Sequence, residues 1–215
     1  MRKYLLFDLD GTLTDPALGI TNSVIYALRK FGIEENDREK LYSFIGPPLY
    51  DSFREIYGLS HDDANLAVGS YREYFAPKGL YENTVYSGVR EMLSALKRSG
   101  RVLILATSKP ERFANEILRH FELDGYFDRV FGATMDETRN KKDDVIAYAL
   151  SNACISPKDA VMIGDRKYDI EGGHKNGMIS VGVLYGYGDI EEMTAAHADI
   201  IAADVKELEK ILENI

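Results

Sequence analysis

The chain of 215 residues has no tryptophan and a single cysteine, Cys154, so it cannot form an internal disulfide bond. So few thiols are typical of a reducing compartment, and we expect a cytoplasmic protein. No apolar run approaches the roughly 20 residues that cross a bilayer, so we expect no membrane partner. Positive charge is also scarce, because the net charge is −9. A nucleic-acid partner, which requires clustered Lys and Arg, is therefore disfavoured, whereas a small anionic substrate needs only a few local cations.

Short apolar runs alternate with helical patterns over most of the chain. The runs are continuous, as in strands that are buried on both faces, and helical spacing such as Val89, Met92, Leu93 and Leu96 lies between them. The expected strands are Tyr4 to Phe7, Val102 to Ala106, Val130 to Ala133, Ala160 to Ile163, Ser180 to Val183 and Asp199 to Ile201. This alternation predicts an α/β fold with a doubly wound, mostly parallel sheet.

One segment interrupts the alternation. From about Pro16 to about Gly79 the sequence shows helical patterns and no convincing strand. Structureless loops of this length are uncommon, so we predict an inserted helical domain at residues 16–79, within a core made of residues 1–15 and 80–215. Nothing indicates an oligomer, so a monomer is the default and a dimer is left open.

The segment after the first expected strand carries two acids, Asp8 and Asp10, followed by Gly11 and Thr12. Alternate strand residues share a direction, and active sites of parallel sheets form beyond the carboxyl ends of the strands. Two such carboxylates can divide the labour, since one attacks while the other transfers protons. A simple Asp-Gly turn is the competing interpretation. A calcium loop of the EF-hand type is disfavoured, because position twelve of the loop would be Gly19.

Three further polar segments lie directly after an expected strand or at the start of an expected helix. Asp165 and Asp169 bring two more acids, and four carboxylates around one crevice favour a Mg²⁺ ion. Thr107 and Ser108 place hydroxyls before an expected helix, which predicts an anion site. Capping of a helix is the simpler alternative for these residues. The pair Lys141-Lys142 offers an ammonium group for a phosphoryl oxygen, although most such pairs are only solvated.

Together these segments resemble the haloacid dehalogenase (HAD) superfamily over nearly the whole chain. The resemblance implies a Rossmann-like core with an α-helical cap domain inserted after the first strand. It also implies that Asp8 is the nucleophile and Asp10 the general acid and base, and that Thr107 and Lys142 bind the phosphoryl group, with Lys141 as the alternative lysine. The residues expected at the substrate are Gly11, Thr12 and Ser108. The expected ligands of Mg²⁺ are Asp8, the carbonyl of Asp10, Asp165 and Asp169. Asp169 is expected to orient Lys142 or a metal-bound water.

The acid at Asp10 distinguishes phosphatases from the dehalogenases of this superfamily, so the resemblance implies phosphoryl transfer. The finer similarity is to phosphoglycolate-phosphatase-like and 5′-nucleotidase-like proteins, which makes phosphoglycolate or a nucleoside 5′-monophosphate the leading substrate. Arg54 in the helical insertion is a candidate ligand for a substrate anion, although an exposed helix cation is the simpler interpretation. A phosphomutase, a phosphonate hydrolase and a non-catalytic regulator with the same fold remain alternatives.

Overall fold

The computed structural model describes residues 2–136 and 138–215. It divides the chain into two compact units. The core unit comprises Met1–Asp15 and Val85–Ile215, and the helical unit comprises Pro16–Thr84. The predicted end of the inserted domain, residue 79, lies five residues before the end of the helical unit at Thr84.

The core unit is built on a parallel sheet of six strands in the order β5-β4-β1-β6-β7-β8. The strands are β1 (Tyr4–Phe7), β4 (Val102–Pro110), β5 (Arg129–Ala133), β6 (Ala160–Gly164), β7 (Ile179–Val183) and β8 (Ile200–Ala202). This sheet confirms the predicted α/β class. Two short strands, β2 (Thr14–Asp15) and β3 (Thr84–Val85), form a separate two-stranded sheet.

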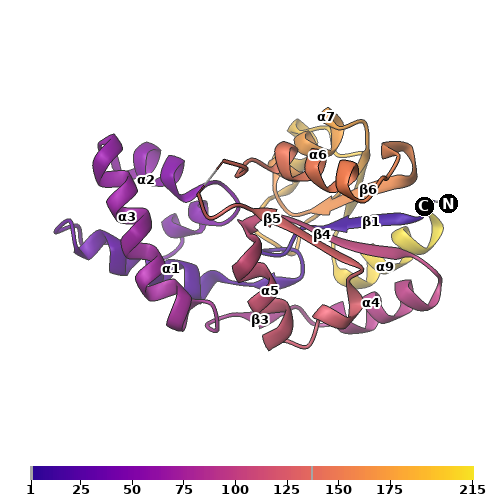
Figure 1. Cartoon of the computed structure of the whole chain (residues 1–215), viewed down its shortest axis with the longest axis horizontal. Helices are drawn as coiled ribbons and strands as arrows, with labels where there is room; N and C mark the ends of the chain where they lie inside the picture. The colour runs from indigo at the N-terminus through magenta and orange to yellow at the C-terminus, as the bar shows by residue number, and fades with distance from the viewer. Residues whose placement is uncertain (1, 137) are drawn as a thin grey trace. The chain divides into compact units, whose positions relative to one another are not determined.

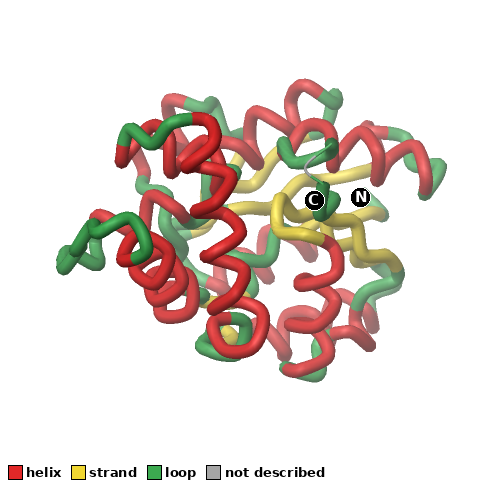
Figure 2. Tube along the Cα trace, turned by 60° about the vertical axis from the view of Figure 1, so that its left-hand side comes forward, coloured by secondary structure: helices red, strands yellow, loops and turns green. Residues whose placement is uncertain are grey.

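Helices cover both faces of the sheet, and the apolar strands are buried between them (Figure 1 and Figure 2). On one face lie α6 (Lys142–Asn152) and α7 (Lys167–Lys175), with α8 (Ile190–Ala195) packed on α7. The other face is covered by α4 (Val89–Arg98), α5 (Glu111–His120) and α9 (Val205–Asn214). Short 3₁₀ helices occupy Asp124–Tyr126 (η3) and Pro157–Asp159 (η4).

The core under α6 shows why the continuous apolar runs become central strands. Leu6, Ile104 and Met162 come from three neighbouring strands and pack against Val145 and Ile146 of α6. Each such side chain contributes about 1.5–3 kcal/mol when it is buried. Because β1 is flanked by β4 and β6, whatever follows it lies at the centre of the carboxyl edge of the sheet.

The helical unit contains α1 (Ala17–Arg29), α2 (Leu49–Tyr57) and α3 (His61–Tyr74). A 3₁₀ helix, η1 (Lys40–Phe44), and a π-helical turn, η2 (Phe75–Gly79), complete it. Residues 16–79 are all described, and none of them lies in a strand. Its own apolar core includes Phe44 and Phe53, whose rings meet edge to face at 5.0 Å. No helix among the described residues of either unit is long and apolar enough to cross a bilayer.

Candidate active site

Asp8 lies directly after β1, and its amide extends the parallel ladder by donating to the carbonyl of Ile163 at 2.9 Å. The Asp8 carboxylate is buried, and Oδ1 accepts a hydrogen bond from the amide of Leu9 at 2.8 Å. The ammonium of Lys142 lies 2.8 Å from the same oxygen. One carboxylate oxygen of Asp8 is therefore held by two donors, and the orientation of the group is fixed.

Lys142 is the first residue of α6, and its side chain is only 3% exposed. Its Nζ lies 2.8 Å from Asp169 Oδ1 and donates to the carbonyl of Ala106 at 3.2 Å. Burial lowers the pKa of Lys142, but the adjacent carboxylates of Asp169 and Asp8 outweigh this effect and raise it. The side chain of Lys141 is exposed, so Lys142 is the lysine that the structure brings to Asp8.

Asp165 follows β6 and is completely buried. Its Oδ1 accepts from the hydroxyl of Thr12 at 3.2 Å, and its Oδ2 accepts from the amide of Tyr187 at 2.8 Å. Thr12 therefore orients Asp165, and its expected contact with substrate stays a prediction. The Tyr187 amide is a contact that the sequence analysis missed, because this loop is 22 residues away from Asp165 in the chain.

Glycines make the close approach to Asp165 possible. Gly11 has φ +79°, and a Cβ there would lie 2.0 Å from Asp165 Oδ2. A Cβ at Gly186 would lie 2.4 Å from Asp165 Cβ. Any side chain at either position would push Asp165 away, so the two glycines allow the chain to pack directly against that carboxylate.

Asp169 lies in the first turn of α7, where Oδ2 accepts from the amide of Arg166 at 3.1 Å. Each of Asp8, Asp165 and Asp169 has a carboxylate oxygen within 4.8 Å of the others. Burial and the neighbouring Asp169 and Asp8 raise the pKa of Asp165 well above its usual value. Burial, which outweighs Lys142, raises the pKa of Asp169 to about 6. This concentration of buried negative charge fits a divalent cation.

Asp10 is two residues beyond Asp8, and its carboxylate Oδ2 accepts from the ammonium of Lys109. Its Oδ1 is buried and has no hydrogen-bond partner among the described residues. Burial raises the pKa of Asp10, although Lys109 opposes the rise. Lys109 is not among the predicted site residues, since a single lysine after a strand carries no signal of its own.

Thr107 lies within β4, and the amide of Lys109 donates to its hydroxyl oxygen at 3.2 Å. The carbonyl of the preceding Ala106 accepts from Lys142, which places Thr107 next to the group that binds Asp8. Ser108 is partly buried in the same strand. The expected contacts of Thr107 and Ser108 with a phosphoryl group stay predictions.

Arg54 belongs to the helical unit, where it lies on α2 with its side chain exposed. Its Nη1 is 3.5 Å from the hydroxyl of Tyr50, and its guanidinium carbon lies 5.8 Å from the centre of that ring. These contacts are all within the helical unit, so the role of Arg54 at a substrate stays a prediction.

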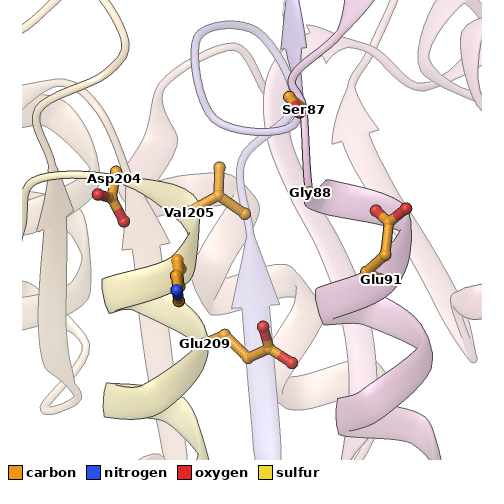
Figure 3. A pocket seen from close by; sticks show the side chains of 7 residues that line it. Ser87, Gly88, Glu91, Asp204, Val205 and Glu209 are labelled. Carbon is orange, nitrogen blue, oxygen red and sulfur yellow. The ribbon is translucent and has the colours of Figure 1, made fainter.

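A separate pocket of 440 Å³ lies in the core unit beside the first turns of α4 and α9 (Figure 3). It is lined by Ser87, Gly88, Glu91, Asp204, Val205, Lys206 and Glu209, which include no predicted site residue. Asp204 caps α9 by accepting from the amide of Glu207 at 2.8 Å. Three of the lining side chains are carboxylates and one is a lysine, so this pocket disfavours a phosphate ester.

The parallel sheet is Rossmann-like, and the family and relatives given next make the chain a hydrolase that acts on phosphate esters. The chain belongs to the haloacid dehalogenase-like hydrolase family, whose model matches residues 5–183. That membership confirms the resemblance that the four sequence segments indicated.

Relatives span almost the whole chain. A 5′-nucleotidase from Pseudomonas aeruginosa is 45% identical over 98% of this chain and 95% of its own length. The tyrosine-protein kinase PtkA from Mycobacterium tuberculosis is 36% identical over 98% of this chain and 72% of its own length. The crystal structure of a predicted phosphatase from Clostridium acetobutylicum has a TM-score of 0.98, 47% identity and full coverage of both chains.

Proposed function

We propose that this protein is a Mg²⁺-dependent phosphatase that hydrolyses a small phosphate monoester through an aspartyl-phosphate on Asp8. One observation carries the proposal: Asp8 Oδ1 lies 2.8 Å from Lys142 Nζ, and Asp165 and Asp169 each have a carboxylate oxygen within 4.8 Å of one of Asp8. A carboxylate that is fixed beside a cation, and whose neighbouring carboxylates favour a second cation, suits attack on an anionic phosphorus.

The residues present fit a magnesium ion. Three buried carboxylates with oxygens within 4.8 Å of one another are hard ligands of the type that Mg²⁺ prefers. Asp8, Asp165 and Asp169 would hold the ion, together with the carbonyl of Asp10. When bound, the ion supplies positive charge that reduces the repulsion between the nucleophile and the substrate phosphate.

In the first step, a carboxylate oxygen of Asp8 attacks phosphorus in line with the ester oxygen. The P–O bond to the leaving alcohol breaks, and Asp10 gives that oxygen a proton. Burial raises the pKa of Asp10, which favours a proton on it at the start. Lys142 and the Thr107 hydroxyl stabilise the negative charge on the equatorial oxygens, and one such donor is worth about 2.7–4 kcal/mol.

In the second step, Asp10 is ionised and takes a proton from a water molecule, whose oxygen attacks the phosphorus. The bond between phosphorus and Asp8 breaks, so phosphate leaves and the carboxylate of Asp8 is restored. The same side chain acts first as an acid and then as a base, so its removal affects both steps. General acid and base catalysis contributes about 100-fold to 10,000-fold to a rate.

The phosphoryl group on Asp8 can pass to water or to another hydroxyl. Hydrolysis is supported by the 5′-nucleotidase relative, whereas Asp10 can activate either water or an alcohol as the acceptor. The kinase relative and the mutase alternative both imply transfer to a second acceptor instead. Free phosphate in a stoichiometric amount with the released alcohol distinguishes hydrolysis from transfer.

The first experiment measures phosphate release from a panel of esters with Mg²⁺ and with EDTA. The panel contains phosphoglycolate, nucleoside 5′-monophosphates and sugar phosphates. We expect turnover with Mg²⁺ and loss of turnover with EDTA. We expect the fastest phosphate release from a nucleoside 5′-monophosphate, because the 5′-nucleotidase relative is 45% identical. No release from any ester would contradict the proposal.

The Asp8→Asn variant tests the nucleophile. Its expected activity is at least about 1,000-fold below that of the wild type, because an amide cannot form the covalent intermediate. The fold should persist, since the change removes one charge from a repelling cluster. The matched control is Asp124→Asn, which removes the same charge from an exposed position in η3. A well-folded Asp8→Asn variant with more than a tenth of wild-type activity would rule out this role.

A further inference from the structure

A buried ion pair links two strand ends at the site. Lys109 Nζ donates to Asp10 Oδ2, and the side chains are only 5% and 13% exposed. A surface pair of this kind contributes little, but a buried pair fixes both groups, because separating them leaves an uncompensated charge. Lys109 therefore determines where the carboxyl group of Asp10 lies.

The backbone of Lys109 is itself held in place. β4 continues as far as Pro110, with an irregularity in its pairing with β5 between Thr107 and Pro110. The amide of Lys109 donates to the Thr107 hydroxyl at 3.2 Å. Gly132 of β5 packs so closely that a Cβ there would lie 2.7 Å from the carbonyl oxygen of Lys109. The lysine thus extends from a fixed strand and not from a flexible loop.

The two oxygens of Asp10 have different surroundings. Oδ2 is occupied by the ammonium of Lys109, whereas Oδ1 is buried without a hydrogen-bond partner in the described parts of the chain. An oxygen that already accepts from an ammonium is a poor site for a transferable proton. Oδ1 is therefore the atom that can exchange a proton with the leaving group and with water.

We propose that Lys109 is a positioning residue that anchors Asp10 through Oδ2 and leaves Oδ1 to protonate the leaving alcohol. This inference rests on the proposed function. Lys109 forms no bond to substrate in this scheme. The proton moves from Asp10 Oδ1 to the alkoxide as the P–O bond breaks, and Asp10 is left as a carboxylate beside the ammonium.

The test compares two esters that differ in their need for that proton. p-Nitrophenyl phosphate releases a stable phenolate, whereas the alkyl ester of the panel that the wild type hydrolyses fastest releases a basic alkoxide. The measured quantity is kcat/KM, which covers only the steps up to departure of the leaving group. We expect Lys109→Met to lower it about 100-fold for the alkyl ester and less than about 5-fold for the aryl ester.

Two further variants keep the test decisive. Lys109→Met leaves Asp10 buried without its cation and can weaken the fold, so the change is also made in the Asp10→Asn background, where no charge is left behind. There we expect no additional loss on the alkyl ester, because Lys109 acts only through Asp10. The control is Lys158→Met, which removes an exposed lysine of η4 and should match the wild type on both esters.

The outcomes separate this inference from the proposed function. A selective loss on the alkyl ester that disappears in the Asp10→Asn background supports the positioning role. Equal losses on both esters, or a further loss in that background, would overturn it and would point to direct binding of the phosphoryl group by Lys109. No turnover by the wild type on either ester would overturn the proposed function, and this inference with it.

Discussion

At the scale of single residues, the close approach of Gly11 to Asp165 decides whether the acidic cluster can form. A Cβ at Gly11 would lie 2.0 Å from Asp165 Oδ2, and the residue has φ +79°. Both the overlap and the left-handed backbone penalise a side chain there. Gly100 has nearly the same backbone, with φ +84°, but nothing lies within 4 Å of the position of its Cβ. Substitution at Gly100 therefore measures the cost of the left-handed backbone alone, whereas substitution at Gly11 adds the cost of steric overlap with Asp165.

We expect Gly100→Ala to lower the free energy of unfolding by about 1–2 kcal/mol and to keep activity, since only the left-handed conformation is penalised. Gly11→Ala should lower that free energy further and should also reduce Mg²⁺-dependent phosphate release, because Asp165 must move. Urea unfolding followed by circular dichroism, together with the phosphate assay, measures both effects. Equal stability and equal activity in the two variants would contradict this explanation of Gly11.

Two acids of the site, Asp8 and Asp165, could be predicted to lie together because each directly follows a recognisable strand. Asp8 and Asp165 both come at the end of an apolar run, and parallel strands bring such ends to one edge. Lys109 could not be predicted in the same way. Its partner Asp10 is 99 residues away in the chain, and only the neighbouring positions of β1 and β4 in the sheet bring the two together.

At the scale of elements, the positions of the six core strands were predicted better than their ends, and their order was not predicted. β4 was expected to end at Ala106, whereas it continues to Pro110. The four added residues are polar or proline, and their pairing with β5 depends on an irregular register that no local pattern encodes. The order of the strands, with β1 at the centre, depends on which helices cover which face, and those are tertiary contacts.

The end of α9 depends on one buried cation. Arg101 Nη2 donates to the carbonyls of Leu212 at 2.7 Å and Glu213 at 3.1 Å, which are orphaned acceptors at the helix terminus. Its Nη1 donates to the carbonyl of Arg2, beside β1. The guanidinium group thus connects the C-terminal helix to the segment just before β1, where the amide of Arg2 also donates to the carbonyl of Ile215 at 2.9 Å.

Replacement of Arg101 by Met should lower the free energy of unfolding by about 1.5–3 kcal/mol, the value of a hydrogen bond to a charged group. Amide hydrogen exchange in the last turn of α9 should become faster. The matched control is Arg98→Met, which removes an exposed arginine whose Nη1 contacts Ser94 Oγ at 2.7 Å, and a change within about 0.5 kcal/mol is expected there. Unchanged exchange in α9 of the Arg101 variant would contradict this role.

At the scale of the whole molecule, acids with shifted pKa values make stability depend on pH in two opposite ways. Burial raises the pKa of Asp169 to about 6. The stability that its protonated form provides is therefore complete when the pH is below the pKa of this group in the unfolded chain, and it is lost as the pH rises through about 6. Glu35 in the helical unit behaves in the opposite way. Hydrogen bonds from Lys40, Asp37 and Tyr57 lower its pKa to about 2.

The ionised carboxylate of Glu35 joins separate parts of the helical unit. Its Oε2 accepts from Lys40 Nζ of η1 at 2.8 Å and from the Tyr57 hydroxyl of α2 at 2.9 Å. The pKa is lower in the folded chain than the usual value of 4.5. The stabilising effect is therefore present above pH 4.5 and decreases as pH falls through about 2.

We expect Glu35→Gln to be less stable than the wild type at pH 7, and the difference in free energy of unfolding to shrink as the pH is lowered from 4.5 towards 2. Urea unfolding at several pH values measures it. The control is Glu34→Gln, since the Glu34 carboxylate pairs with Arg29 at 3.6 Å with both side chains more than 60% exposed, and such surface pairs contribute about 0–1 kcal/mol. If the difference in free energy of unfolding between wild type and Glu35→Gln stayed constant between pH 7 and 3, Glu35 would act through its shape and not through its charge. The neutral glutamine would then differ equally from the ionised and the protonated glutamate.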